Sequence, residues 1–288
     1  MKKLSVVLAV RNEEKNLSDC LDSIKNIADE IVVVDEYSTD KTVEVAKKYG
    51  AKVYLEPHNE IFHVTKQKAI DKASGDWILQ LDADEIVSKS LGEEIKKAID
   101  MSYDDITNRK INPKKEELFE RHQRLIEERD GQLGKNKGEI VAFFIPRKNF
   151  FLGKPLIHGG VYPDGVIRLI KKGKAHLPAK SVHEQMVIDG KIAWLNNDLE
   201  HHDSPNLRRY LIRLNRYTDL HARELKEKKS PKNIFYFFYY SVIKFKLGFL
   251  KLFFLHAGFK DGIRGFLWSF LSSMHYPIAY FKYWTGYN

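Results

Sequence analysis

The sequence has little cysteine and few long apolar runs. A single cysteine, Cys20, stands among 288 residues, which excludes an internal disulfide framework and a zinc site built from several thiolates. A reducing compartment fits this composition. No stretch of about 18 uncharged apolar residues occurs, so we expect no conventional membrane span. The apolar run that follows Lys2 and Lys3 lacks a cleavage site of small residues, so we interpret it as a first strand and not as a signal peptide.

Two glycine-rich signatures of nucleotide binding are also missing. No glycine lies between Ala9 and Asn16, so no G-x-G-x-x-G turn follows the predicted first strand. A Walker-type loop is absent as well. If the chain binds a nucleotide, other polar groups at the strand ends must hold it.

Acidic residues are scarce in the second part of the chain. The net charge is +9, but residues 1–100 carry 15 Lys and Arg against 20 Asp and Glu, so the remaining 188 residues carry +14. Nucleic acid, an anionic membrane and a phosphorylated small molecule are all compatible partners for a basic protein. The basic run Arg208, Arg209, Arg213, Arg216 with Arg223 lies in no recognised nucleic-acid-binding module. Its aromatic residues are not arranged as in a base-stacking platform, so we expect no nucleic-acid partner.

The last 55 residues are aromatic and basic. Residues 234–288 hold 20 of the chain's 35 aromatic residues, six Lys or Arg and one acid, Asp261. Helices of this composition suit the interface of an anionic membrane. Aromatic residues at helical spacing also occur in cores and dimer interfaces, which is the alternative explanation. We predict membrane contact for this region.

The first hundred residues alternate strand and helix patterns. Strands are predicted at 4–10, 31–34, 52–55 and 77–81, with helices at 62–73 and 89–99 and further helices starting near Asn12 and Ser38. Repeated strand–helix units indicate an α/β fold with a mainly parallel sheet flanked by helices. In such sheets ligands bind at the carboxyl ends of the strands.

The rest of the chain divides into three parts. Residues 102–138 are highly charged and predict a solvated helix followed by a flexible loop, inserted between core strands. Apolar strand patterns return after the insertion, at 140–145 and 166–170. Apolar residues at helical spacing predict a helix over 206–229. We expect a catalytic domain over 1–204 and a helical, membrane-associating region over 205–288.

Acidic residues follow two of the predicted strands. Asp82 and Asp84 lie two residues apart at the end of a buried strand, where both carboxylates can reach one cavity. Oxygen ligands of this kind favour Mg²⁺ or Mn²⁺, which can bridge to a diphosphate. Asp35 ends another strand, and Arg11 and Glu13 follow the first. The sequence therefore predicts a nucleotide site with a divalent cation at this edge.

Three segments together resemble a known family. Residues 5–17, the stretch VVVDEYSTD at 32–40 and the stretch QLDADE at 80–85 are similar to the family 2 glycosyltransferases of GT-A fold, whose second motif usually reads V-V-D-D-G-S-x-D. Glu36-Tyr37 replaces the D-G pair here. Weaker matches at 147–149, 151–154, 158–160, 182–184, 200–202 and 258–266 resemble the branch of lipopolysaccharide core glucosyltransferases.

The resemblance implies roles for individual residues. Asp35 would bind the nucleotide base, Asp82 the ribose or the metal side, and Asp84 the metal, while Arg11 and Glu13 would line the nucleoside pocket. Glu184 would be the general base that deprotonates the acceptor hydroxyl in an inverting transfer.

Four further residues are candidates by their chemistry. Arg168 can hold phosphate oxygens through bidentate contacts, as can Arg147, although both could be surface cations. His201 and His202 are adjacent on a predicted strand and face opposite sides, so at most one binds metal. We assign that role to His202, with His201 as the alternative. Cys20 is expected to pack on the first helix.

The predicted function is transfer of a sugar from a nucleotide diphosphate sugar to a saccharide, lipid-linked as in lipopolysaccharide or another cell-envelope glycan. We expect the enzyme in the cytoplasm, peripheral on the inner face of the cytoplasmic membrane. Two alternatives stay open. A haloacid-dehalogenase-like phosphatase also places D-x-D after a strand, and a non-catalytic membrane adaptor could use a transferase fold.

Overall fold

The chain forms two compact units. The computed structural model describes residues 1–109, 111–178 and 185–286. The first unit comprises Met1–Arg147 and Pro163–His201, and the second comprises Lys148–Tyr162 and His202–Asn288. The second junction lies close to the expected boundary after residue 204, but residues 148–162 join the C-terminal unit. They do so because Phe151 and Leu156 pack in one apolar cluster with Tyr210.

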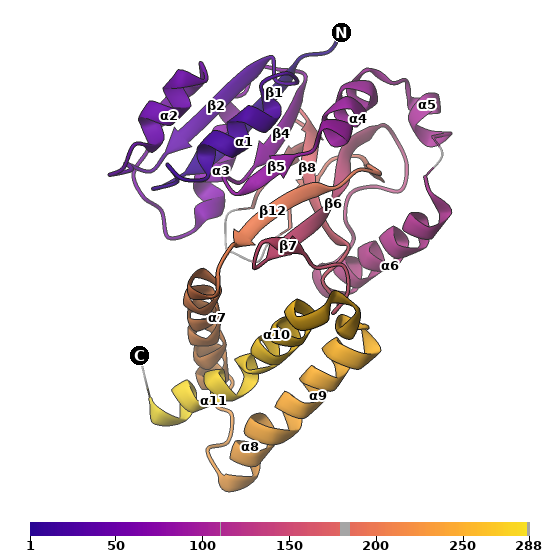
Figure 1. The fold of residues 1–288 in the computed structure, drawn as a ribbon. Helices are drawn as coiled ribbons and strands as arrows, with labels where there is room; N and C mark the ends of the chain where they lie inside the picture. Colours follow the sequence, from indigo (N-terminus) through magenta and orange to yellow (C-terminus); the bar gives the residue numbers. More distant parts are fainter. Residues whose placement is uncertain (110, 179–184, 287–288) are drawn as a thin grey trace. The chain divides into compact units, whose positions relative to one another are not determined.

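The core of the first unit is a mixed sheet (Figure 1). Strands β1 (Leu4–Val10), β2 (Glu30–Asp35), β3 (Lys52–Leu55) and β4 (Trp77–Leu81) are parallel and lie in the order β3-β2-β1-β4. Next to β4 lie β8 (Asp164–Lys171) and then β6 (Ile140–Phe151), both antiparallel to their neighbour. The expected α/β fold with parallel strands at its start is confirmed.

Shorter strands extend this sheet. β5 (Glu85–Val87) pairs antiparallel with β12 (Leu199–Ser204), and β11 (Lys191–Trp194) pairs parallel with β6. The end of β6 pairs with β7 (Lys154–Pro155) within the second unit. β9 (Ala175–His176) and β10 (Val187–Ile188) form a separate two-stranded sheet.

Helices cover both faces of the parallel strands (Figure 1). Because side chains alternate along a strand, Val6 and Leu8 of β1 belong to one apolar cluster and Val7 to another. The first cluster includes α1 (Leu17–Ile24) and α4 (Lys89–Asp100), and the second includes α3 (Phe62–Lys72) and α6 (Pro113–Asp130). The remaining helices are α2 (Thr42–Lys48) and α5 (Tyr103–Thr107).

Two local expectations were wrong. The helix in the charged insertion is not simply solvated, because Phe119 and Ile126 of α6 are 1% and 7% exposed and Phe119 stacks on Trp194 at 4.3 Å. Two apolar residues seven apart suffice to hold one helical face against a core. The first helix begins at Leu17 and not near Asn12, because Asn12 has φ +56°, outside the right-handed helical region.

The second unit is helical apart from its strand segments. The predicted helix over 206–229 is confirmed as α7 (Leu207–Glu227), which Asn206 caps by accepting a hydrogen bond from the backbone N–H of Arg209. A continuous helix follows through α8 (Ile234–Phe238), π-helical η1 (Tyr239–Lys244), α9 (Phe245–Leu250) and π-helical η2 (Lys251–Leu255). A 3₁₀ turn, η3 (Gly258–Asp261), leads to α10 (Gly262–Ser273) and α11 (His275–Thr285).

The glycine-rich motif at 258–266 joins the segments of this second unit. A Cβ atom at Gly265 would lie 1.8 Å from the carbonyl oxygen of Gly258, so only glycine fits there. The carboxylate of Asp261 accepts hydrogen bonds from the backbone N–H groups of Ile157 (3.1 Å) and His158 (2.8 Å). The motif therefore ties residues 148–162 to the C-terminal helices.

Within the described ranges, no helix combines the length and the apolar character that crossing a bilayer requires.

Candidate active site

The predicted site residues that follow β1, β2 and β4 lie at one edge of the sheet. In the strand registers Val10 of β1 pairs with Asp35 of β2, and Leu8 of β1 pairs with Leu81 of β4. Asp35 and Asp82 therefore lie at the carboxyl ends of two strands that flank β1. Two strand spacings separate them at the backbone, or about 10 Å. This span suits a nucleoside lying across the end of β1.

The loops after β1 and β2 are held together by polar contacts. Asn12 accepts a hydrogen bond from the backbone N–H of Thr39 through its side-chain oxygen (2.8 Å), and its own N–H donates to Ser38 Oγ (2.8 Å). Asp35 is fully buried and accepts from the N–H (2.8 Å) and the hydroxyl (2.5 Å) of Ser38. Glu13 accepts from the Asn16 amide at 2.7 Å. These bonds fix the rim beside exposed Arg11.

The substitution of the usual D-G pair leaves a tight turn in place. Tyr37 adopts φ +52°, a conformation that favours glycine, and its side chain is 59% exposed. The side chain of Glu36 is buried, and its carboxylate contacts His58 Nδ1 (2.6 Å) and the hydroxyl of Thr65. Tyr37 thus presents an aromatic ring to solvent two residues after Asp35.

Asp82 lies between two cations. Its Oδ1 is 2.5 Å from Lys66 Nζ, and its Oδ2 accepts from an Arg168 nitrogen at 2.5 Å. Burial alone would raise the pKa of Asp82, but the Arg168 and Lys66 cations outweigh it and hold that pKa well below its usual range. Asp82 is therefore an anion whose charge is already balanced, with 24% of its side chain exposed.

Arg168 is a buried cross-link of the site. Its guanidinium donates to Asp82, to Glu85 Oε1 (2.7 Å) and to the side-chain oxygen of Gln80. Burial opposes the charge, but the Asp82 and Glu85 carboxylates prevail and raise the pKa of Arg168. The side chain is 9% exposed, so it lies in the interior and is not the surface cation considered as an alternative.

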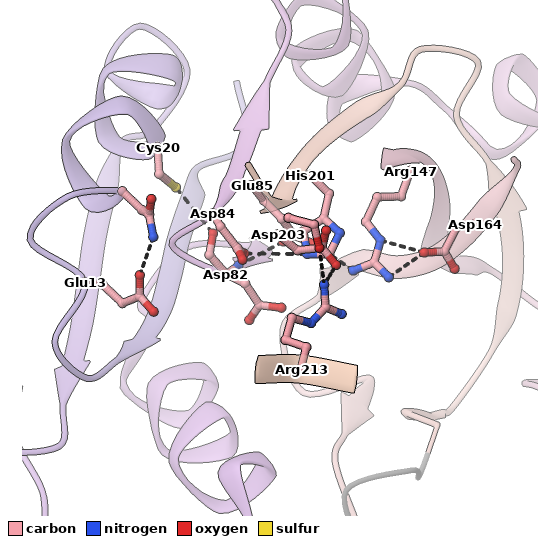
Figure 2. A network of polar contacts seen from close by, with 12 residues as sticks. Glu13, Cys20, Asp82, Asp84, Glu85, Arg147, Asp164, His201, Asp203 and Arg213 are labelled. Atoms are coloured by element: carbon pink, nitrogen blue, oxygen red, sulfur yellow. Dashed lines mark hydrogen bonds and ion pairs between the residues drawn. The ribbon is translucent and has the colours of Figure 1, made fainter. Parts of the chain in front are cut away.

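Glu85 and Arg147 extend this network (Figure 2). Glu85 is fully buried, and its Oε2 accepts from the backbone N–H of Asp82 at 2.9 Å. Arg147 donates to Glu85 Oε1 (3.3 Å) and from two nitrogens to Asp164 Oδ2 (2.9 and 2.5 Å). Burial acts against the Arg147 cation, but the carboxylates of Asp164 and Glu85 raise its pKa. The chain of contacts fixes the turn that carries both aspartates.

A histidine lies beside Asp84 (Figure 2). The register of β12 on β5 pairs His201 with Glu85, and this places His201 Nε2 at 3.7 Å from Asp84 Oδ1. Burial, followed by the nearby Arg147 cation, lowers the pKa of His201 well below its usual value, so the ring is neutral. His202 stacks on Phe150 with ring centroids 4.1 Å apart. The assignment of a metal ligand to His202 stays a prediction, and the contact with Asp84 favours the alternative, His201.

The described side chains fit a divalent cation that also needs substrate oxygens. Asp84 supplies a carboxylate, which is a ligand type for Mn²⁺ and Mg²⁺, and neutral His201 supplies an imidazole, which binds transition-metal ions more readily than it binds Mg²⁺. Across residues 1–109, 111–178 and 185–286, no three His, Cys, Asp or Glu side chains are grouped to hold an ion. Mg²⁺ is commonly bound through one or two carboxylates together with substrate phosphates, which is the arrangement these residues allow.

Two other residues complete the account of the predicted site. Cys20 is buried on α1, as expected, with its Sγ 3.6 Å from the carbonyl oxygen of Asp82. Burial, and then the Glu85 and Asp84 carboxylates, raise its pKa, so the group is an unreactive thiol. Glu184, the predicted base, lies outside the described residues.

Comparison with known proteins identifies the family. The model of glycosyl transferase family 2 matches residues 5–159. The chain belongs to this family. The GT-A fold expected from the resemblance is confirmed, as is the helical C-terminal region. This family 2 chain is 28% identical over 278 residues to an uncharacterised glycosyltransferase of Rickettsia typhi, covering 93% of this chain and 82% of the relative.

Two further proteins are similar to parts or most of this glycosyltransferase. It is 25% identical over 272 residues to LpsC of Rhizobium meliloti, a lipopolysaccharide core biosynthesis glycosyltransferase, covering 92% of this chain and 85% of LpsC. This agrees with the resemblance to the lipopolysaccharide core branch. Glucosyl-3-phosphoglycerate synthase of Mycobacterium tuberculosis, solved with Mn²⁺ and UDP-glucose, shows 30% identity over 30% of this chain and 34% of its own, with a TM-score of 0.27.

Several residues of the site carry no signal in the sequence. Lys66, Glu85 and Asp164 belong to the candidate site only because they form ion pairs with residues that are distant in the sequence. Glu85 directly follows the D-x-D stretch, but nothing local shows that its side chain turns inward. Lys66 lies in a helix of ordinary charged composition, and its partner Asp82 is 16 positions away.

Proposed function

We propose that this family 2 glycosyltransferase moves a sugar from a nucleotide diphosphate sugar to a saccharide acceptor, with inversion at the anomeric carbon. The acceptor we propose is lipid-linked, as in lipopolysaccharide or another cell-envelope glycan. The observation that carries the proposal is the shared edge of the sheet, where Asp35, Asp82 and Asp84 follow the strands on either side of β1. The similarity to LpsC supports the class of acceptor.

The donor would lie across the end of β1. Asp35 would accept a hydrogen bond from the base, and Arg11 and Glu13 would line the nucleoside pocket. Asp82, held by Lys66 and Arg168, would accept from the ribose hydroxyls. Arg168 already donates hydrogen bonds to Gln80, Asp82 and Glu85. We therefore propose that Arg168 is a positioning residue, which acts on the donor by holding Asp82 in place.

Asp84 and His201 would hold Mg²⁺ or Mn²⁺ next to the donor diphosphate. Such an ion supplies charge neutralisation for the leaving diphosphate. The chain's own contribution is to keep His201 neutral and to fix the turn that carries Asp84 through Glu85 and Arg147. Glu184 remains our candidate for the base that takes the acceptor proton as the hydroxyl attacks the anomeric carbon.

The choice between the two histidines can be tested by ligand binding. His201→Ala should remove the Mn²⁺-dependent part of nucleoside diphosphate binding, because it deletes the imidazole beside Asp84. His202→Ala, the matched control, should keep it. We would measure thermal shifts with UDP, GDP, ADP and CDP, with and without Mn²⁺, and expect about 3–5 °C of Mn²⁺-dependent stabilisation in the unaltered chain. A loss confined to His202→Ala would restore the original assignment.

The phosphatase alternative receives no support. The chain belongs to a glycosyltransferase family, and Asp82, which would have to act as the nucleophile, is ion-paired with Lys66 and Arg168. The adaptor alternative makes a different prediction from ours: vesicle binding without turnover of any nucleotide sugar.

The surface of the second unit supports a membrane partner. Within the helix from Ile234 to Leu255, Phe235, Leu247 and Phe254 are 80%, 60% and 57% exposed. Lys246, Lys251 and Lys260 are exposed cations nearby in the chain. Asp261, the one acid of residues 234–288, is turned inward toward His158. Exposed aromatic and cationic side chains without acids suit an anionic lipid surface, which we propose is the inner face of the cytoplasmic membrane.

Substitutions on this helix test the membrane contact. Leu247→Ser with Phe254→Ser should weaken binding to vesicles that contain phosphatidylglycerol by about tenfold per side chain, because each contributes apolar area to the bilayer interface. Leu55→Ser is the control, since Leu55 is 53% exposed on β3 of the first unit. Sedimentation with vesicles provides the measurement. Equal binding by all variants would contradict the proposed contact.

A further inference from the structure

A cationic hollow lies beside α7, away from the residues assigned above. It has a volume of about 340 Å³ and is bounded by α7, by Lys232 of the following loop and by the end of α11. This volume lies at the lower end of the range for small-ligand sites. On α7 the lining positions Asp219, Arg223 and Lys226 follow helical spacing, so they share one face.

The charges around the hollow are unbalanced. Four cations line it, namely Arg223, Lys226, Lys232 and Lys282. Among its described lining residues Asp219 is the one acid, and its Oδ1 is 2.6 Å from Lys282 Nζ. Lys282 also donates to Asn215 and Thr218. Lys282 and Asp219 therefore form an ion pair that has no net charge.

The other three cations remain available to a ligand. Arg223 and Lys226 are exposed and make no ion pair or side-chain hydrogen bond within the described part of the chain. Lys232 Nζ lies 4.6 Å from the centre of the Tyr283 ring and donates to the carbonyl oxygen of Trp284 at 3.2 Å, which leaves further N–H groups free. A guanidinium and two ammonium groups around one hollow match the oxygens of a phosphate.

We infer that this hollow binds a phosphate group, of the kind that an anionic lipid headgroup carries. The inference builds on the proposed membrane contact: a headgroup phosphate held here would add a specific contact to the apolar surface of the helix from Ile234 to Leu255. A free phosphate offers the same chemistry, and the two sources are separated below.

The test compares two double variants of the full chain with the same change in charge. Arg223→Ala with Lys226→Ala removes two cations from the hollow, and Arg208→Ala with Arg216→Ala removes two exposed cations elsewhere on α7. Alanine favours the helix in both, so folding should be kept. Inorganic phosphate would be titrated by calorimetry. Vesicles of phosphatidylcholine with and without phosphatidylglycerol would be tested by sedimentation.

We expect the hollow variant to lose binding to phosphatidylglycerol vesicles by about tenfold more than the control variant, and to lose phosphate binding. If the unaltered chain binds inorganic phosphate through Arg223 and Lys226 but binds no vesicle, the site stands with free phosphate as its ligand and the membrane proposal fails. Equal losses in both variants, or phosphate binding that the hollow variant keeps, would overturn the inference.

Discussion

Asp84→Asn is expected to reduce sugar transfer by at least about 10²–10³-fold. The amide keeps the size of the side chain but removes the negative charge that would bind the divalent cation next to His201. The leaving diphosphate would then develop charge without its main electrostatic stabilisation. The rate should be measured with the nucleotide sugar whose diphosphate shows the largest Mn²⁺-dependent thermal shift.

A second readout separates this effect from misfolding. The Mn²⁺-dependent part of nucleoside diphosphate binding should disappear in Asp84→Asn, while the melting temperature without ligand stays close to that of the unaltered chain. Asp19→Asn makes the same chemical change at an exposed position of α1 and should leave transfer intact. Full activity of Asp84→Asn would exclude the proposed metal role of Asp84.

Arg168→Met is expected to lower the free energy of unfolding by about 3–5 kcal/mol. Arg168 is 9% exposed and Glu85 is fully buried, so the substitution leaves the charges of Glu85 and Asp82 without their principal partner. When an apolar side chain replaces one member of a buried ionic network, the remaining charges are left buried without a partner, and their desolvation lowers the free energy of unfolding. Urea denaturation followed by circular dichroism measures the loss.

Two companion variants show whether the charge network is the cause. Adding Glu85→Gln to Arg168→Met should restore part of the stability, because one unpaired carboxylate is then neutral. Arg216→Met, at an exposed position of α7, should change the free energy of unfolding by less than about 0.5 kcal/mol. A loss below about 1 kcal/mol for Arg168→Met would show that Asp82 and Glu85 do not depend on this cation.

Much of the first unit could be predicted because its signals are local. The predicted strand bounds at 4–10, 52–55 and 77–81 match β1, β3 and β4, because short apolar runs between polar turns define buried parallel strands. Asp35, Asp82 and Asp84 could be placed at strand ends for the same reason, since strand ends are visible in the sequence. The buried residues of α6 were missed because two apolar positions in a charged helix give a weak pattern.

The sequence by itself determined the family, the parallel strands and the acidic residues that end them, because motifs and alternating apolar runs are properties of neighbouring residues. Only the tertiary structure decided which charges meet. Lys66 and Arg168 reach Asp82 from α3 and β8, and His201 reaches Asp84 through the register of β12 on β5. Such contacts depend on strand order and register, which are set by how the whole sheet packs. A shift of one residue in β12 would turn His201 to the other face.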